Sequence, residues 1–185
     1  LFCQTRYPDE SFRIYNNALA GDRAIYSRLR VRKSGGAFHQ DILRNRPNVA
    51  VVMLGMNDAK NADVWTQPDD VKQQRREKAA TEYRDSMDDL IHGLQTGGVK
   101  RIIFVVSCPY DETTASTRPV MHGKNDFIRD VTGQYLRAAA QENNATLIDL
   151  NAPMLAINAR EQETDPKFSL ADLGDRVHPL ERGHF

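Results

Sequence analysis

Short apolar runs recur along the chain, and longer segments with helical periodicity separate them. Each run is about as long as a strand, is rich in β-branched residues and is nearly continuous rather than alternating. Strands buried on both faces have this pattern, which is typical of parallel sheets covered by helices. We predict four strands, at Ile14–Leu19, Val49–Leu54, Ile102–Val106 and Thr146–Leu150.

Two segments between these runs place apolar side chains on one face at helical spacing. Gly97-Gly98 and Asn143-Asn144 are predicted to end the two helices. Strands and helices in this alternating order predict right-handed βαβ crossovers and an α/β fold, a three-layer α/β/α sandwich with a parallel sheet in one domain over residues 1–185. The apolar positions are Tyr83, Met87, Leu90, Ile91 and Leu94 in one helix, and Phe127, Val131, Tyr135 and Ala138 in the other.

Two polar segments that follow strands are longer than a minimal connection. They are Met56–Asp70, which contains Trp65, and Cys108–Val120, which contains the Thr/Ser-rich stretch Thr113–Thr117. Ligands bind beyond the carboxyl ends of the strands in open α/β sheets, so both segments are candidate walls of a substrate cleft. The alternative is that they are solvated surface loops without a role.

Composition narrows the classes of function. Lys+Arg and Asp+Glu number 25 each and interleave, so no basic stripe indicates a nucleic-acid partner. The chain has neither an apolar run of about 18 residues nor a basic amphipathic stretch, so its sequence does not indicate a segment that spans or coats a membrane. We expect a small, neutral or weakly charged substrate. Cys108 ends an apolar run, where a buried thiol is the ordinary interpretation. The sequence leaves the cellular compartment open, and a secreted or periplasmic location is one alternative.

Gly21 lies in the segment Asn17-Ala18-Leu19-Ala20-Gly21-Asp22, where the first predicted strand ends. Glycine tolerates positive φ and lets a ligand approach the backbone, and Asp22 is a suitable cap for a following helix. The N–H of Gly21 would then face the cleft. Taken alone, a strand-to-helix turn with Gly and Asp is usually only a turn.

Asn57 lies in Gly55-Met56-Asn57-Asp58, directly after the second predicted strand. An amide at the carboxyl end of a buried strand can direct its NH₂ donors to the point where negative charge develops on a substrate oxygen. The alternative is an asparagine that bonds within its own loop.

Asp175 and His178 lie in Asp175-Arg176-Val177-His178-Pro179. A spacing of three within a tight turn lets the carboxylate accept the imidazole Nδ1–H and leaves Nε2 free as a base. Pro179 disfavours helical backbone at His178 and is favoured at the first position of a helix, so we expect His178 at a loop-to-helix junction.

The three segments, in this order, resemble blocks II, III and V of the GDSL/SGNH hydrolase family. The resemblance implies a serine esterase in which His178 is the general base and Asp175 orients it. It also implies an oxyanion hole formed by the N–H of Gly21 and the side chain of Asn57, a small-molecule ester as substrate, such as a short-chain acyl ester or an acetylated carbohydrate, and no metal or organic cofactor.

In the GDSL/SGNH family the nucleophile is the serine of a Gly-Asp-Ser block. This chain departs from the family there, because it contains no Gly-Asp-Ser. Its Gly-Asp pairs are followed by Arg23 and Arg176. We therefore expect the serine upstream of Leu1, on a strand that would be the centre of a flavodoxin-like sheet of order 2-1-3-4-5, and we expect the domain to be truncated at both ends. None of the serines present has a matching context, namely Ser11, Ser27, Ser34, Ser86, Ser107, Ser116 and Ser169.

Two other functions stay open. One is a non-catalytic carbohydrate-binding or scaffold relative that lacks the serine, and the other is a flavodoxin-like binder of a nucleotide or phosphate. The second lacks support, because the chain has no glycine-rich loop that would cradle a phosphate. The remaining histidines have no metal-ligand spacing and are expected to be surface or packing residues, namely His39, His92, His122 and His184.

Overall fold

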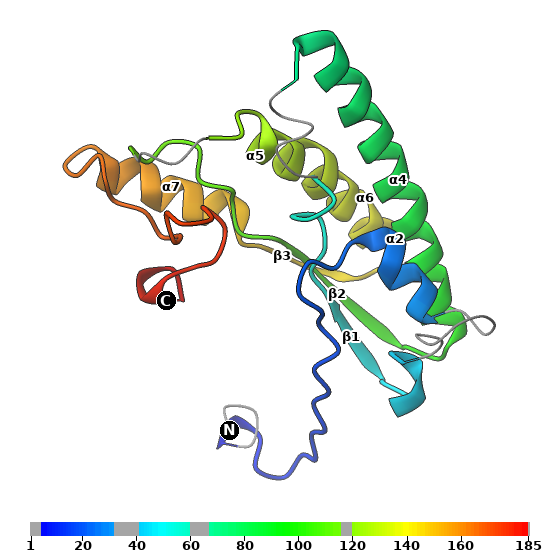
Figure 1. Ribbon diagram of the computed structural model, residues 1–185. Helices are drawn as coiled ribbons and strands as arrows, with labels where there is room; N and C mark the ends of the chain where they lie inside the picture. The colour runs from blue at the N-terminus through cyan, green and yellow to red at the C-terminus, as the bar shows by residue number, and fades with distance from the viewer. Residues whose placement is uncertain (1–4, 32–40, 60–66, 116–119, 185) are drawn as a thin grey trace.

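A computed structural model describes residues 5–31, 41–59, 67–115 and 120–184. Three parallel strands form its sheet in the order β1-β2-β3, with β1 at Val49–Val52, β2 at Arg101–Val106 and β3 at Thr146–Asp149 (Figure 1). Val51 pairs with Ile103, and Ile103 in turn pairs with Thr146. The last three predicted strands and their parallel arrangement are thus confirmed.

Helices connect the strands as the periodicity predicts. The long helix α4 ends at Gly97, and α6 ends at Asn143, where Asn144 takes a left-handed φ of 48°, so both predicted ends are confirmed. The helices are α2 (Ala24–Ser27), the 3₁₀ turns η1 (Arg28–Val31) and η2 (Leu43–Asn45), α4 (Asp69–Thr96), α5 (Lys124–Phe127), the π-helical η3 (Ile128–Gly133), α6 (Gln134–Glu142), α7 (Asn151–Gln162) and the 3₁₀ turn η4 (Glu181–His184).

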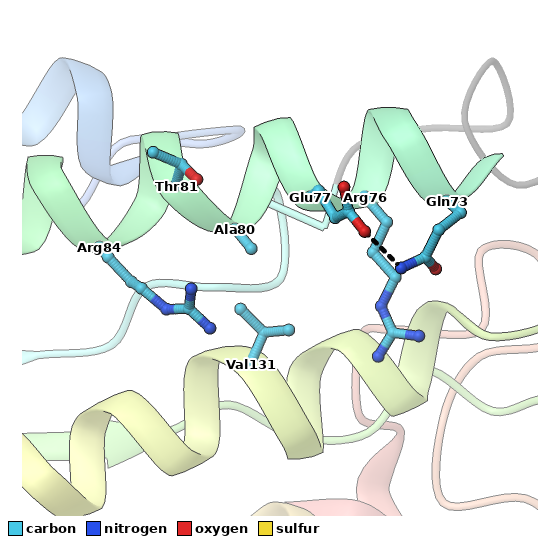
Figure 2. Close-up of a pocket in the computed structure, with 7 residues that line it drawn as sticks. All are labelled: Gln73, Arg76, Glu77, Ala80, Thr81, Arg84 and Val131. Carbon is cyan, nitrogen blue, oxygen red and sulfur yellow. Dashed lines mark hydrogen bonds between the residues drawn. The ribbon is translucent and has the colours of Figure 1, made fainter. Parts of the chain in front are cut away.

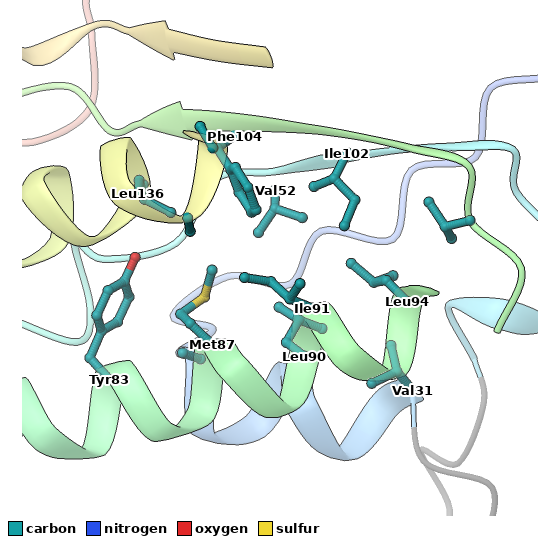
Figure 3. Close-up of a cluster of buried hydrophobic side chains, with 14 of the residues drawn as sticks. Val31, Val52, Tyr83, Met87, Leu90, Ile91, Leu94, Ile102, Phe104 and Leu136 are labelled. Atoms are coloured by element: carbon teal, nitrogen blue, oxygen red, sulfur yellow. The ribbon is translucent and has the colours of Figure 1, made fainter. Parts of the chain in front are cut away.

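The main core lies between one face of the sheet and the helices α4 and α6 (Figure 3). Val52, Ile102 and Phe104 contribute from the strands, and each is at most 8% exposed. Alternate residues of a strand face opposite sides, so the same strands present a second set of side chains away from α4. On that second face Val49, Val51 and Ile148 are between 44% and 66% exposed.

The predicted strand Ile14–Leu19 is wrong. The segment is extended but has no ladder partner among the described residues, and Ile14 is 80% exposed (Figure 1). Its Asn16 side chain instead accepts a hydrogen bond from the N–H of Ala18 at 3.0 Å. Such local bonds offer the backbone an alternative to a sheet, and an apolar run forms a strand only beside another strand.

The chain after His178 also differs from the prediction. Pro179 does not open a helix: it forms an isolated antiparallel bridge with Ala171, and the 3₁₀ turn η4 begins only at Glu181. The bridge holds the segment before the Asp175 turn against the segment after it. Trp65, Ser116, Thr117, His39 and Cys3 lie outside the described residues.

Candidate functional site

Asp175 and His178 are in direct contact. The imidazole Nδ1 of His178 lies 2.5 Å from Oδ2 of Asp175, and the other carboxylate oxygen accepts the backbone N–H groups of Val177 at 2.8 Å and His178 at 3.0 Å. The side chain of His178 is 81% exposed. The spacing of three therefore gives the predicted contact, and the ring is accessible from solvent.

The contact sets the charge of Asp175. Partial burial of the carboxyl would raise its pKa, but hydrogen bonds from the backbone and imidazole of His178 and from the N–H of Val177 outweigh this effect and lower the pKa. The carboxylate stays ionised near neutral pH. An ionised carboxylate at Nδ1 favours the imidazole tautomer that carries its proton on Nδ1.

Gly21 and Asn57 come from different parts of the chain and meet at one turn. Asn57 Nδ2 donates to the backbone oxygen of Asp22, the residue after Gly21, at 3.2 Å. Gly21 has a φ of 74°, as the sequence predicted for a turn that needs glycine, and both residues are exposed. The two predicted oxyanion donors are therefore neighbours.

Asp58 and not Asp22 receives the first N–H of α2. Asp58 Oδ1 accepts from Ala24 N at 2.9 Å, whereas Asp22 accepts from Arg23 N and Ser27 Oγ. The capping role predicted for Asp22 is corrected accordingly. Asp58 follows Asn57 directly and is 3% exposed, so this bond fixes the Asn57 loop against the helix after Gly21.

A buried arginine supports the same turn from the other side. Arg30 is 4% exposed, and its guanidinium contacts Asp22 at 3.0 Å, Asp41 at 2.9 Å and the backbone oxygen of Asn17 at 2.7 Å. The guanidinium thus ties together both ends of the segment that contains Gly21.

Gly55 sets the direction of the Asn57 loop. Its φ is 131°, and a Cβ atom there would lie 2.8 Å from Oγ1 of Thr132 in the π-helical η3. The Thr132 hydroxyl donates to the oxygen of Ile128 at 2.7 Å, so it is held in place. Only glycine lets the strand end pass this close to the helix.

One apolar cluster lies beneath both parts of the candidate site. The cluster contains buried side chains of α4, of the run α5–η3 and of the segments that follow β1 and β2, among them Ala59, Tyr110 and Phe127. Met56 and Val177, the neighbours of Asn57 and His178, both pack against it. The Asn57 loop and the Asp175 turn therefore share one support.

The loop after β2 also contacts the Asp175 turn directly. Cys108 Sγ donates to the oxygen of Val177 at 3.3 Å, and Asp111 N donates to the oxygen of Arg176 at 2.9 Å. Burial of Cys108, together with the nearby charge of Asp175, raises the pKa of its thiol, so the thiol stays protonated at neutral pH. This loop is one of the two cleft walls predicted from the sequence.

Two of the hollows on the surface of the described chain adjoin elements of the candidate site. A groove of about 290 Å³ runs between α4 and η3, and Figure 2 shows Arg76 and Arg84 directed into it beside Val131. A second, of about 470 Å³, is lined in part by Ala171, which forms the bridge with Pro179, and by Leu180, which follows that bridge. Within the residues that the structure describes, no three His, Cys, Asp or Glu side chains gather as metal ligands.

Comparison with known proteins places these features in a family. Residues 3–184 match the GDSL-like Lipase/Acylhydrolase family. The chain belongs to this family. A curated relative, the acetylxylan esterase of Geobacillus stearothermophilus, is 23% identical over 181 residues, which cover 98% of this chain and 71% of the relative.

Solved structures show that this GDSL family member shares its fold with larger proteins. A gut microbial enzyme described as diltiazem-metabolizing superposes with a TM-score of 0.82 at 30% identity, and the match covers 99% of this chain but 39% of that chain. The acetylxylan esterase structure gives a TM-score of 0.65 at 23% identity, covering 98% and 71%. The fold class predicted from the sequence, a three-layer α/β/α sandwich with a parallel sheet, is confirmed at this level.

Two further structures of that esterase are described as catalytic mutants, one with a serine and one with a histidine replaced by alanine.

In this GDSL family chain, none of the helices within the described ranges combines the length and hydropathy needed to cross a bilayer.

Proposed function

We propose that this GDSL family chain forms the main part of a carboxylic ester hydrolase. The observation that carries the proposal is the Asp175–His178 pair, with Nδ1 held 2.5 Å from a carboxylate oxygen while the ring is 81% exposed. A histidine oriented in this way can take a proton from an alcohol through Nε2 and return it to the leaving group.

The roles of the remaining groups follow from where charge develops. Attack on an ester carbonyl creates an oxyanion, which needs hydrogen-bond donors that are already in place. Gly21 N–H and the Asn57 amide are our candidates, and the contact of Asn57 with Asp22 O supports them as a single donor site. The nucleophile that we propose is a serine outside these 185 residues, because no serine of the chain follows Gly-Asp.

For the substrate we propose an acetyl or other short-chain acyl ester, with an acetylated carbohydrate as the leading class. The similarity to an acetylxylan esterase over 98% of the chain supports this choice. Acetylated xylooligosaccharides are therefore the first carbohydrate substrates to test. Because the identity is only 23%, a chromogenic acetyl ester is tested beside them as a general substrate.

The test uses a full-length protein, defined here as residues 1–185 together with the serine-bearing segment that the proposal requires. A chromogenic acetyl ester should give a burst of product followed by steady turnover, and a serine-directed phosphonate should abolish both. His178→Ala should lower kcat by about three orders of magnitude or more. If the full-length protein hydrolyses neither kind of ester, the proposal fails, and the non-catalytic carbohydrate-binding relative becomes the better interpretation.

A further inference from the structure

Arg176, inside the Asp175 turn, is buried, whereas the side chains of Asp175 and His178 are exposed. The residue is 2% exposed, while the side chains of Asp175 and His178 are 45% and 81% exposed. Its φ is 65°, in the left-handed region that side chains other than glycine rarely adopt. The turn therefore directs one long cationic side chain inward at a cost in backbone energy.

The guanidinium of Arg176 bonds to the loop after β2. Its Nη1 donates to the backbone oxygen of Asp111 at 3.0 Å and to that of Thr114 at 3.2 Å. In return, Asp111 N donates to the backbone oxygen of Arg176 at 2.9 Å. Three hydrogen bonds thus join the Asp175 turn to a loop more than 60 residues earlier in the chain.

The loop that receives these bonds is itself fixed. The Asp111 carboxylate is 1% exposed and accepts the N–H groups of Thr113 and Thr114, each at 3.0 Å, and the hydroxyl of Ser169 at 2.5 Å. The hydroxyl of Thr114 donates to the same carboxylate and also contacts the oxygen of Phe168. The carbonyl groups that Arg176 reaches therefore have a defined position.

We propose that Arg176 is a positioning residue that holds the Asp175–His178 pair in its working orientation by anchoring the turn to the Asp111 loop. The side chains of the pair are exposed, so the turn beneath them must be held by its buried residues. Val177 packs against the apolar cluster, and the Arg176 guanidinium adds the polar anchor two residues before His178. The effect on turnover rests on the proposed esterase function; the effect on the imidazole does not.

The first test reads the tautomer of His178 and requires no activity. Long-range ¹H–¹⁵N spectra of the full-length protein, recorded where the ring is neutral, report which ring nitrogen carries the proton. The wild type should carry it on Nδ1, facing Asp175. Arg176→Gly permits the left-handed backbone but removes the guanidinium, and it should shift the population toward Nε2–H, the form that free histidine prefers.

The second test is kinetic. Since a misplacement of about 1 Å can lower a rate by about 100-fold, Arg176→Gly should lower kcat for an acetyl ester at least 10-fold and change KM less than about twofold. Arg176→Lys, which keeps a cation that is one bond shorter, should recover part of kcat and part of the Nδ1–H population. An equal loss in the two variants would contradict a graded anchor.

A matched control separates positioning from stability. Leu136→Ala removes a fully buried side chain of α6 in the core between α4 and the sheet, so it should lower the melting temperature while leaving the tautomer and kcat unchanged. If Arg176→Gly does not fold, the same spectra are recorded for Arg176→Gln, whose amide is too short to reach both carbonyls. A wild-type tautomer in the folded variant would overturn the proposal, whereas an inactive wild type with the expected tautomer shift would overturn only the esterase function.

Discussion

Nδ1 of His178 lies 2.5 Å from Oδ2 of Asp175, and the second oxygen of the same carboxylate accepts the backbone N–H of His178. The carboxylate therefore orients both the ring and the peptide that carries it. Most of the ring remains open to solvent, so we expect substitution of this pair to lower the proposed activity more than the folding stability.

Asp175→Asn is the most direct test of that relationship. The amide can present an N–H to Nδ1 and favour the wrong tautomer, so kcat should fall by about 10³–10⁴-fold, as it does for the equivalent change in other serine hydrolases. Steady-state kinetics of the full-length protein give kcat, and thermal unfolding should show a shift of only a few degrees. A variant with more than a tenth of the wild-type kcat would exclude Asp175 from the mechanism.

Asn57→Ala should remove one oxyanion donor. By analogy with other hydrolases we expect kcat to fall by about 100- to 1000-fold, while KM changes little. Stability should decrease by about 1 kcal/mol, because among the described residues this exposed side chain donates a single hydrogen bond, to Asp22 O. Asn48→Ala, just before β1 at its amino end, is the matched control, and equal kinetic losses in the two variants would contradict a role for Asn57.

Gly55→Ala should destabilise the fold by about 2–3 kcal/mol, because the new Cβ would meet Thr132 Oγ1 at 2.8 Å and the φ of 131° disfavours alanine. Gly98→Ala is the control, since its φ is 93° and no atom lies within 4 Å of an added Cβ. Its loss should be about 1 kcal/mol, from the backbone alone. Urea unfolding measures both changes, and equal losses would show that contact with Thr132 is unimportant.

Asp111 should make stability depend on pH in the acid range. Burial of its carboxyl would raise the pKa, but hydrogen bonds from Ser169, Thr114 and Thr113 lower it below the ordinary value. A folded pKa below the unfolded value of about 3.9 stabilises the fold above about pH 4, and this contribution is lost as the pH falls through the folded pKa.

Asp111→Asn lacks that contribution. The variant should be less stable than the wild type by about 1–3 kcal/mol at pH 7, and the difference should shrink below about pH 4. Urea unfolding at a series of pH values measures the difference. Asp69→Asn, an exposed carboxyl at the start of α4, serves as the control and should show little effect at any pH. A difference for Asp111→Asn that stays constant down to pH 2 would contradict this account.

Much of the sheet could be predicted from the sequence because its strands are short, continuous apolar runs. The helices could be predicted because their apolar positions repeat every three to four residues. Ile14–Leu19 shows the limit of that reasoning. Its composition suits a strand, but a strand also needs a neighbour and a covered face, which composition does not report.

The Asp175–His178 contact could be predicted because it is local, and Gly21 because its positive φ leaves few alternatives to glycine. Asp58, Asp111 and Arg176 were missed as supports of the site. Each acts on a residue more than 30 positions away, and the sequence offers no periodic signal for such bonds. The one available indication was the placement of an arginine between Asp175 and His178.

The bare side of the sheet has a practical consequence. Val49 and Val51 on β1 and Met53 directly after it form an apolar row, each about half exposed or more, and β1 lies at an edge of the sheet that the described residues form. Salts that are excluded from protein surfaces, such as ammonium sulfate, strengthen the association of apolar surfaces. We therefore expect a polypeptide limited to these 185 residues to precipitate early during salting-out, and dilute, low-salt buffers to preserve it best.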